Sequence, residues 1–196
     1  MLIVITGPSG VGKTTIIESL LKLDANLTYS VSLTTRQPRP GEVNGVNYFF
    51  VSDEEFQKAI ANGEFAEWSE VYGKYYGRLK KDLEEQMRCG DVLVGIDVQG
   101  ASKLRDKYPK GVFIFLLPRS QKALELQLRG RKTDDEASVK TRLEAALREM
   151  RQAESFDYKV VNYEIDKTVR KIKSILAAEK NAIETSKQSR KLDKGG

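Results

Sequence analysis

The 196-residue sequence contains no histidine and only one cysteine, and these absences exclude several kinds of site. Without histidine, neither a Ser-His-Asp triad nor a histidine-ligated metal can form. The single cysteine, Cys89, allows no intramolecular disulfide and no cysteine-cluster zinc site, and we expect it to be a core residue at a helix end. No apolar run approaches the roughly 18–20 residues of a membrane span. We therefore expect a cytoplasmic protein without a membrane partner.

The charge balance is moderately basic, and its distribution narrows the choice of partner. Lysine and arginine number 33 against 28 acidic residues, so the net charge of +5 admits nucleotides, nucleic acid or a membrane surface. Most of the surplus lies in residues 119–148, which carry a net +3, and the rest largely in residues 184–196. Because no basic stripe is interleaved with aromatic residues, we expect nucleotides and no nucleic acid as partners.

Apolar runs alternate with amphipathic stretches along the chain, a pattern that predicts an α/β fold with a largely parallel sheet. The polar end of the chain, residues 184–196, is predicted to be a flexible tail. The expected strands cover residues 2–6, 29–34, 48–51, 92–98, 112–117 and 158–163. The expected helices cover residues 14–23, 52–63 and 80–89, the periodic stretch from Val139 to Met150, and the stretch from Val169 to Leu176.

A glycine-rich loop follows the first predicted strand. Its sequence is Gly7-Pro8-Ser9-Gly10-Val11-Gly12-Lys13-Thr14, which fits the phosphate-binding pattern G-x-x-x-x-G-K-[ST]. The glycines let several backbone N–H groups point at one centre, and the helix that follows adds its positive dipole end. In this pattern Lys13 reaches the β- and γ-phosphates of a nucleotide, and the Thr14 hydroxyl binds Mg²⁺. The loop predicts ATP or GTP binding without separating a kinase from a GTPase or a motor, although the N-K-x-D motif of a GTPase is absent.

Three further segments give the chain a specific likeness. They are Ser30-Val31-Ser32-Leu33-Thr34-Thr35-Arg36-Gln37-Pro38-Arg39, Glu64-Phe65-Ala66-Glu67-Trp68 and Gly73-Lys74-Tyr75-Tyr76-Gly77. Together with the phosphate-binding loop, they resemble guanylate kinase over about residues 1 to 180. The resemblance implies a Mg²⁺-dependent transfer of the ATP γ-phosphoryl group to GMP, and by extension to dGMP. It also implies that GMP contacts Ser32, Arg36, Arg39, Tyr48, Glu67, Tyr76 and Asp97.

The chemistry of these side chains agrees with that role. Two guanidinium groups, Arg36 and Arg39, lie three residues apart in a proline-rich loop and can clamp one phosphate. The phenols of Tyr48 and Tyr76 can donate to the same phosphate. A buried Glu67 can accept from two adjacent N–H groups, which guanine presents at N1 and N2 and adenine lacks.

A second set of residues completes the catalytic site that the resemblance implies. Arg131 and Arg142 match the arginines of a mobile lid that reach ATP and the transferring phosphoryl group. Asn162, at the end of the last strand, matches a position near the adenine, and Asp97 ends a predicted strand at the sheet edge where functional groups collect. The catalytic residues implied are Lys13, Arg36, Asp97, Arg131 and Arg142.

Two positions depart from the family pattern. Arg78 stands where the family usually has threonine or serine, so the reading of the guanine edge is altered. Gly95 stands where the family commonly has a carboxylate, so Mg²⁺ depends on Thr14, Asp97 and the phosphates. We expect activity to survive both changes.

The resemblance predicts a P-loop kinase core flanked by helices, with a small GMP-binding subdomain and a helical lid. The core comprises residues 1–31, 80–118 and 149–183, the GMP-binding subdomain 32–79 and the lid 119–148, all within one domain of residues 1–183. The alternatives are a non-catalytic guanylate-kinase-like interaction module, which typically loses the phosphate loop, and a P-loop kinase for another acceptor. The sequence favours neither a monomer nor a homo-oligomer.

Overall fold

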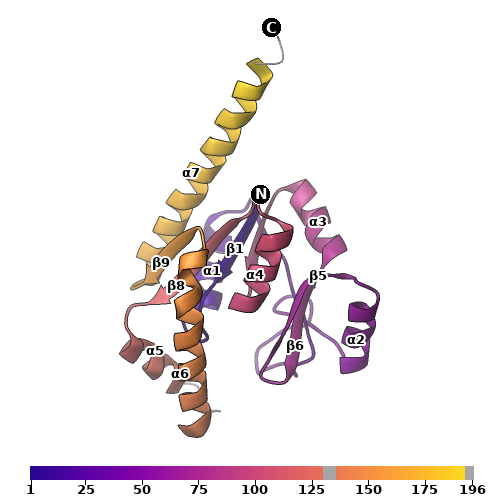
Figure 1. Ribbon diagram of the computed structural model, residues 1–196, viewed down its shortest axis with the longest axis vertical. Coiled ribbons are helices and arrows are strands. Elements are labelled where there is room, and N and C mark those ends of the chain that lie inside the picture. Colours follow the sequence, from indigo (N-terminus) through magenta and orange to yellow (C-terminus); the bar gives the residue numbers. More distant parts are fainter. Residues whose placement is uncertain (130–135, 193–196) are drawn as a thin grey trace.

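The computed structural model describes residues 1–129 and 136–192, with side chains described for 1–129 and 139–186. Its centre is a five-stranded parallel sheet in the order β2-β7-β1-β8-β9. Strands β1, β8 and β9 of this sheet are labelled in Figure 1. The strands are β1 (Leu2–Thr6), β2 (Leu27–Tyr29), β7 (Asp91–Gly95), β8 (Val112–Pro118) and β9 (Tyr158–Asn162). This confirms the predicted α/β fold.

Helices cover both faces of this sheet because its central strands are apolar throughout. In β1, Ile3 and Ile5 pack on one side and Leu2 and Val4 on the other. The first face is covered by α1 (Lys13–Leu23) and α7 (Ile165–Leu192), and the second by α3 (Lys80–Cys89) and α4 (Val98–Lys107). Every residue of β1 is buried, as the continuous apolar run predicts for a strand inside a parallel sheet.

A second, four-stranded sheet lies beside the core in the order β4-β3-β6-β5. Its strands are β3 (Leu33–Thr34), β4 (Phe49–Phe50), β5 (Phe65–Val71) and β6 (Lys74–Leu79), and α2 (Asp53–Ala61) packs on it through Phe56. The predicted capping box at the start of α2 is confirmed, since Glu55 N donates to Ser52 Oγ and Ser52 N donates to Glu55 Oε2.

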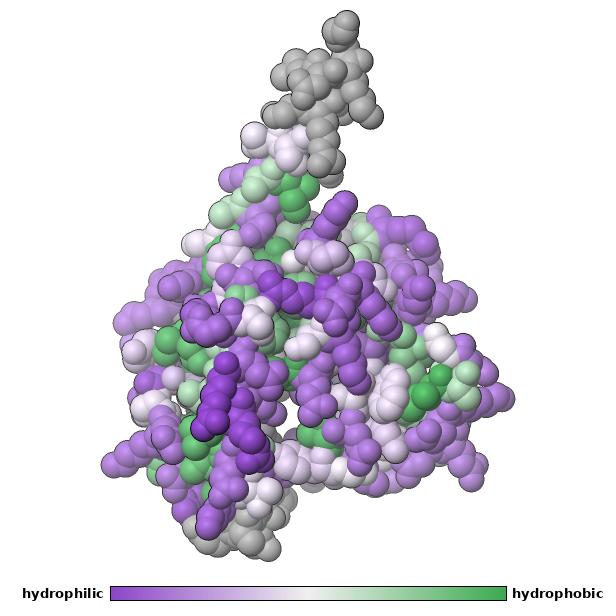
Figure 2. All heavy atoms as spheres, viewed as in Figure 1, coloured by the Kyte–Doolittle hydropathy of each residue, from purple (hydrophilic) through white to green (hydrophobic). Residues whose placement is uncertain are grey.

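Helices α5 (Gln121–Arg129) and α6 (Glu136–Met150) form a separate lobe with a small apolar core of their own. Leu124 and Leu128 of α5 pack against Val139 and Ala146 of α6. In Figure 2 the surface is hollowed between this lobe and the lobe of the second sheet. The 3-10 turn η1 (Arg151–Ser155) connects α6 to β9.

Helix α7 extends beyond the body of the molecule (Figure 1). We expected a flexible tail from residue 184, but the helix continues to Leu192. The segment from Glu184 to Leu192 is rich in helix-forming residues and lacks glycine and proline, so nothing in it ends the helix. Figure 2 shows apolar side chains on the part of α7 that leaves the body. Among the described residues, no helix is both long enough and apolar enough to cross a membrane.

Other local predictions also differ from the structure. Cys89 is exposed rather than buried, because Leu83 and Met87 form the inward face of α3 and Cys89 lies two residues past it. The expected strand over residues 29–34 divides into β2 and β3, which belong to different sheets. The β5–β6 hairpin was not predicted, although Tyr72-Gly73, both with positive φ, forms its two-residue turn.

Candidate active site

The phosphate-binding loop closes tightly between β1 and α1. Gly7 and Gly12 have φ angles of 143° and 93°, in the region that favours glycine, and a Cβ on Gly7 would lie 2.4 Å from the Leu116 carbonyl oxygen. No side chain caps α1, whose N-cap is Gly12, so its first N–H groups face the loop. Lys13 Nζ donates to the carbonyl oxygens of Gly7 and Pro8 at 2.5 and 3.2 Å, which folds the lysine back over the loop.

Asn162 supports this loop from the end of β9. Its Nδ2 donates to the Val11 carbonyl oxygen at 2.8 Å, and its Oδ1 accepts from Thr168 Oγ1 at 3.0 Å. Val11 and Asn162 also line an open surface pocket of about 400 Å³, together with Pro118 and the exposed Tyr163. This volume is in the range of small-molecule sites, so the cavity can hold the base of a nucleotide whose phosphates lie on the loop.

Three of the predicted phosphate-binding side chains gather in the second lobe. Arg36 lies 5.3 Å from the centre of the Tyr48 ring, and the Tyr48 and Tyr76 rings meet edge to face at 5.9 Å. Burial raises the pKa of Tyr48 to about 12, so its phenol stays protonated and can donate. Arg36 Nη1 and Nη2 both donate to the Glu42 carboxylate at 2.9 Å. Arg39 is exposed; its backbone N–H donates to Glu42 Oε2, and its carbonyl oxygen accepts from Glu42 N.

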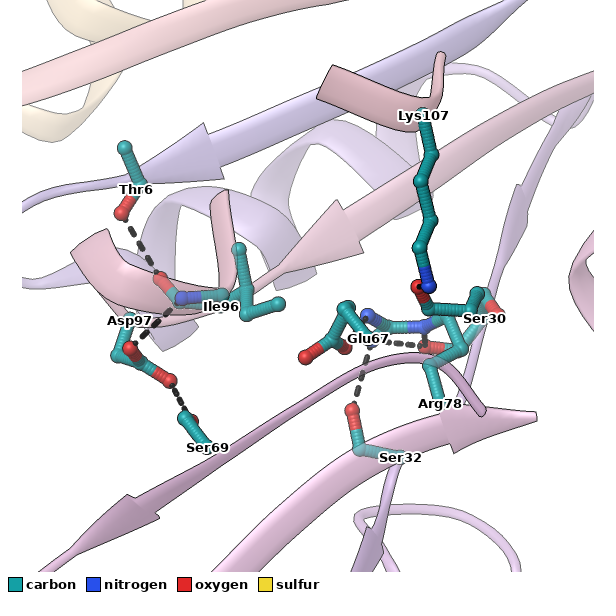
Figure 3. A network of polar contacts seen from close by, with 11 residues as sticks. Thr6, Ser30, Ser32, Glu67, Ser69, Arg78, Ile96, Asp97 and Lys107 are labelled. Atoms are coloured by element: carbon teal, nitrogen blue, oxygen red, sulfur yellow. Dashed lines mark hydrogen bonds and ion pairs between the residues drawn. The ribbon is translucent and has the colours of Figure 1, made fainter. Parts of the chain in front are cut away.

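Glu67 lies on β5 directly opposite Arg78 of β6, next to a β-bulge (Figure 3). Arg78 Nη1 donates to Glu67 Oε1 at 3.1 Å, and Arg78 Nη2 donates to Ser32 Oγ at 2.7 Å. Glu67, Arg78 and Ser32 are all buried. Burial raises the pKa of Glu67 to about 7, although the Arg78 charge acts in the opposite direction.

Asp97 holds the first turn of α4 and faces the second lobe. Its Oδ1 accepts from the backbone N–H groups of Gln99 and Gly100, which makes Asp97 the N-cap of the helix. Its Oδ2 accepts from Ser69 Oγ on β5 at 2.5 Å. The predicted position after β7 is confirmed, and the carboxylate links the core to the second sheet (Figure 3).

Of the two predicted lid arginines, the structure describes only Arg142. Arg142 of α6 lies 5.4 Å from the centre of the Tyr72 ring, so it reaches from the lid lobe to the tip of the β5–β6 hairpin. Arg131 lies outside the described residues. Thr14 is exposed in the first turn of α1, next to the phosphate-binding loop.

Gly95 leaves no room for a carboxylate without a change in the core. A Cβ at this position would lie 2.4 Å from Ile17 Cδ1 and 3.5 Å from the Tyr29 hydroxyl. The end of the Ile17 side chain therefore takes the space that a side chain at position 95 would need.

Two residues that sequence reasoning missed also belong to the site. Ser30 accepts from Arg78 Nε and Nη2 through its carbonyl oxygen, and only its place in the Ser30 to Arg39 segment could have indicated this. Glu149, at the end of α6, is partly buried beside the phosphate-binding loop. Burial raises its pKa, and the Lys13 charge and a hydrogen bond from the Ser9 backbone lower it. No pattern in the sequence identifies Glu149.

A phosphate-binding loop at the carboxyl end of a parallel sheet, with a polar lobe and a helical lobe beside it, defines a P-loop phosphotransferase with two substrate-binding lobes. Residues 1–179 match the family model described as guanylate kinase. The chain is 44% identical over 181 residues to the guanylate kinase of Carboxydothermus hydrogenoformans, covering 92% of this chain and 89% of that one. It is 46% identical over 180 residues to the guanylate kinase of Halalkalibacterium halodurans, covering 91% and 88%.

A solved structure agrees with these relatives. The crystal structure of guanylate kinase from Anaplasma phagocytophilum superposes with a TM-score of 0.75 at 36% identity, covering 91% of this chain and 85% of that chain. The chain therefore belongs to the guanylate kinase family. A gluconokinase from Sinorhizobium meliloti, at 16% identity and a TM-score of 0.50, shares the fold alone.

Proposed function

We propose that this protein transfers the γ-phosphoryl group of Mg²⁺-bound ATP to GMP, and to dGMP, giving ADP and the nucleoside diphosphate. The observation that carries the proposal is the buried Glu67 carboxylate beside the Ser32 hydroxyl. Both lie on the lobe of the second sheet, β4-β3-β6-β5, which we call the acceptor lobe. A carboxylate can accept from both N1–H and N2–H of guanine, and adenine offers no such pair. Relatives named guanylate kinase at 42–46% identity support the same reaction.

The phosphate-binding loop and Asn162 supply the ATP site. The loop N–H groups and the start of α1 bind the phosphates, and Asn162 keeps the loop closed through the Val11 carbonyl. On binding, Lys13 exchanges its bonds to Gly7 and Pro8 for the β- and γ-phosphates. The adenine then occupies the cavity lined by Val11 and Tyr163.

The acceptor lobe supplies the GMP site. Arg36, Arg39, Tyr48 and Tyr76 bind its phosphate, and for this Arg36 must release at least part of its bond to Glu42. The acceptor oxygen of GMP is already anionic at neutral pH, so the chain needs no histidine general base. Arg142 and Arg131 of the lid then neutralise charge on the transferring group and exclude water.

The described residues fit a Mg²⁺ ion that depends mainly on substrate oxygens. They contain no cluster of three acidic, cysteine or histidine groups that could hold a metal by itself. Thr14 and Asp97 are the protein groups that would contribute, which suits Mg²⁺ because it usually retains waters and binds phosphates with one or two protein ligands. When bound, the ion supplies charge neutralisation on the ATP phosphates.

A direct experiment measures ADP release with Mg·ATP in the presence and absence of GMP. The proposal predicts GMP-dependent release that stops when EDTA removes the metal. A protein that binds GMP but releases no ADP would instead be the non-catalytic module. A cytoplasmic location is part of the proposal, since a nucleotide kinase needs the intracellular ATP pool.

A further inference from the structure

Arg78 departs from the family pattern and makes more buried polar contacts than the other side chains of the acceptor lobe. Its Nη1 donates to Glu67 Oε1, its Nη2 donates to Ser32 Oγ, and its Nε and Nη2 share the Ser30 carbonyl oxygen. Arg78 is fully buried, with 0% of its surface exposed. It contacts both groups proposed to face the base, Glu67 and Ser32, and has no exposed surface of its own (Figure 3).

An arginine side chain has N–H donors and no acceptor, so each of its partners must accept. Glu67 accepts as a carboxylate, and pairing with a guanidinium favours its ionised form. Ser32 Oγ uses one lone pair for Arg78, which leaves the Ser32 hydroxyl proton to be donated elsewhere. One arginine thus fixes an acceptor and a donor side by side.

This arrangement offers the hydrogen-bonding groups that guanine requires, namely an acceptor for N1–H and N2–H and a donor for O6. Guanine presents N1–H and N2–H as donors next to the O6 acceptor, whereas adenine presents the N1 acceptor next to the N6 amino donor. A Glu67 acceptor next to a Ser32 donor matches guanine and opposes adenine at both positions. Without Arg78, nothing else described fixes which way the Ser32 hydroxyl points.

The surroundings keep Glu67 in place while leaving Arg78 as its direct ion-pair partner. Lys107 and Lys103 of α4 donate to the Ala66 and Trp68 carbonyl oxygens, on either side of Glu67. The charged groups that face Glu67 are Arg78 from β6, Asp97 at the start of α4, and these two lysines. A Cβ on Gly100 would lie 3.0 Å from Glu67 Oε2, so this oxygen rests against the positive end of α4.

We propose that Arg78 is a positioning residue for base selection, which orients Glu67 as an acceptor and Ser32 as a donor toward the guanine edge. This inference rests on the proposed function, because it takes the base of GMP to bind at Glu67. It assigns selectivity in this chain to a buried arginine at a position where the family usually has a hydroxyl group.

The test compares Arg78→Met with the wild type, using Arg88→Met, an exposed arginine on α3, as the matched control. Calorimetry measures the Kd of GMP and AMP from about pH 6 to about pH 9, and steady-state assays measure KM and kcat. We expect Arg78→Met to weaken GMP binding by about 10- to 100-fold and to reduce the preference for GMP over AMP, measured as the ratio of their Kd values. The KM of ATP should stay unchanged. The pH below which GMP binding weakens should also move upward, because Glu67 has lost its counter-charge.

Arg78→Lys and the double variant Arg78→Met/Glu67→Gln guard against a simple folding defect. The lysine keeps a charged donor and should recover part of the GMP affinity and selectivity. The double variant removes the buried, unpaired carboxylate, so it should fold even if Arg78→Met does not, and it should bind GMP without preference over AMP.

The inference would be overturned if folded Arg78→Met kept the wild-type Kd for GMP, the wild-type ratio of GMP to AMP affinity and the wild-type pH at which GMP binding weakens. An equal loss of affinity for GMP, AMP and ATP would also overturn it, because such a loss indicates general disruption of the protein. If the double variant retains the wild-type ratio, the inference also fails. The proposed function would fail separately, if the wild-type protein released no ADP with GMP. The calorimetric comparison measures binding alone, so it tests the role of Arg78 without turnover.

Discussion

Asn162, at the end of β9, donates from Nδ2 to the carbonyl oxygen of Val11 in the phosphate-binding loop, 2.8 Å away. The two residues are 151 positions apart in the chain, so the parallel sheet alone brings them together. A Cβ on Gly12 would lie 2.8 Å from the same Nδ2 atom, which shows how closely the amide packs on the loop. This contact makes the loop's shape depend on the last strand.

Asn162→Ala should weaken ATP binding and leave GMP binding unaffected. It removes the bonds to Val11 and Thr168, each worth about 1 kcal/mol, so we expect the KM of ATP to rise about 10-fold. Steady-state assays with each substrate varied in turn measure the effect. Asn181→Ala, on an exposed part of α7, is the matched control, and an equal rise in both KM values would contradict the assignment.

Lys13→Ala should remove turnover while GMP still binds. The lysine is placed to reach the β- and γ-phosphates, and loss of such a group costs at least about 100-fold in kcat. Calorimetry should give an unchanged Kd for GMP, because the acceptor lobe is separate. A comparable loss of GMP affinity, absent from the control Lys22→Ala, would contradict the layout of two sites.

Much of the core could be predicted because its signals are local. The apolar strands, the capping box at Ser52 and the glycine loop each follow from short patterns in the sequence. The β5–β6 hairpin escaped because the strand pattern is interrupted by Gly77 and Arg78, both buried. Burial of Arg78 depends on partners 46 and 48 residues away, which no local pattern reveals.

The core around Gly95 gives a prediction on stability. Gly95→Ala places a Cβ 2.4 Å from Ile17 Cδ1, so we expect it to cost about 1 kcal/mol of unfolding free energy. Ile17→Val removes that methyl group and by itself costs about 0.5–1.5 kcal/mol. Denaturant unfolding of both single variants and the double variant should show a double-variant loss smaller than the sum. Strict additivity would show that the contact does not matter.

The outer part of α7 should be dispensable for stability, in contrast to its inner part. Val169, Ile172 and Leu176 pack into the core, whereas residues 184–186 are exposed. Removal of residues 184–196 should change the free energy of unfolding by no more than about 0.5 kcal/mol. Leu176→Ala, in the same helix, should cost about 2–5 kcal/mol by thermal or denaturant unfolding. A large loss on truncation would assign the outer turns a structural role.

GMP binding should weaken in acid because of Glu67. Burial raises the pKa of Glu67 to about 7, so below that pH the carboxyl is increasingly protonated and loses acceptor capacity toward guanine. The KM of GMP should therefore rise as the pH falls through about 7, while the KM of ATP changes little. A KM for GMP that stays constant from pH 8 down to about pH 6 would contradict an ionised Glu67 as the guanine acceptor.

The candidate site could be predicted only in part, for reasons of chemistry. The residues proposed to bind phosphate follow from charge and glycine patterns, and the structure brings Arg36, Tyr48 and Tyr76 together. Sequence alone does not show that Glu42 holds Arg36, that Asp97 caps α4 or that Glu149 lies by the loop. Those contacts join separate elements, and the side chains involved occur just as often on solvated surfaces.

The most direct test of the account is a coupled assay of Mg·ATP against GMP, dGMP, AMP, CMP and UMP. We predict rapid ADP release with GMP and dGMP, and rates lower by at least about 100-fold with the other three acceptors, because only guanine pairs with Glu67 and Ser32. Activity with AMP equal to that with GMP, or no GMP-dependent ADP release, would contradict it.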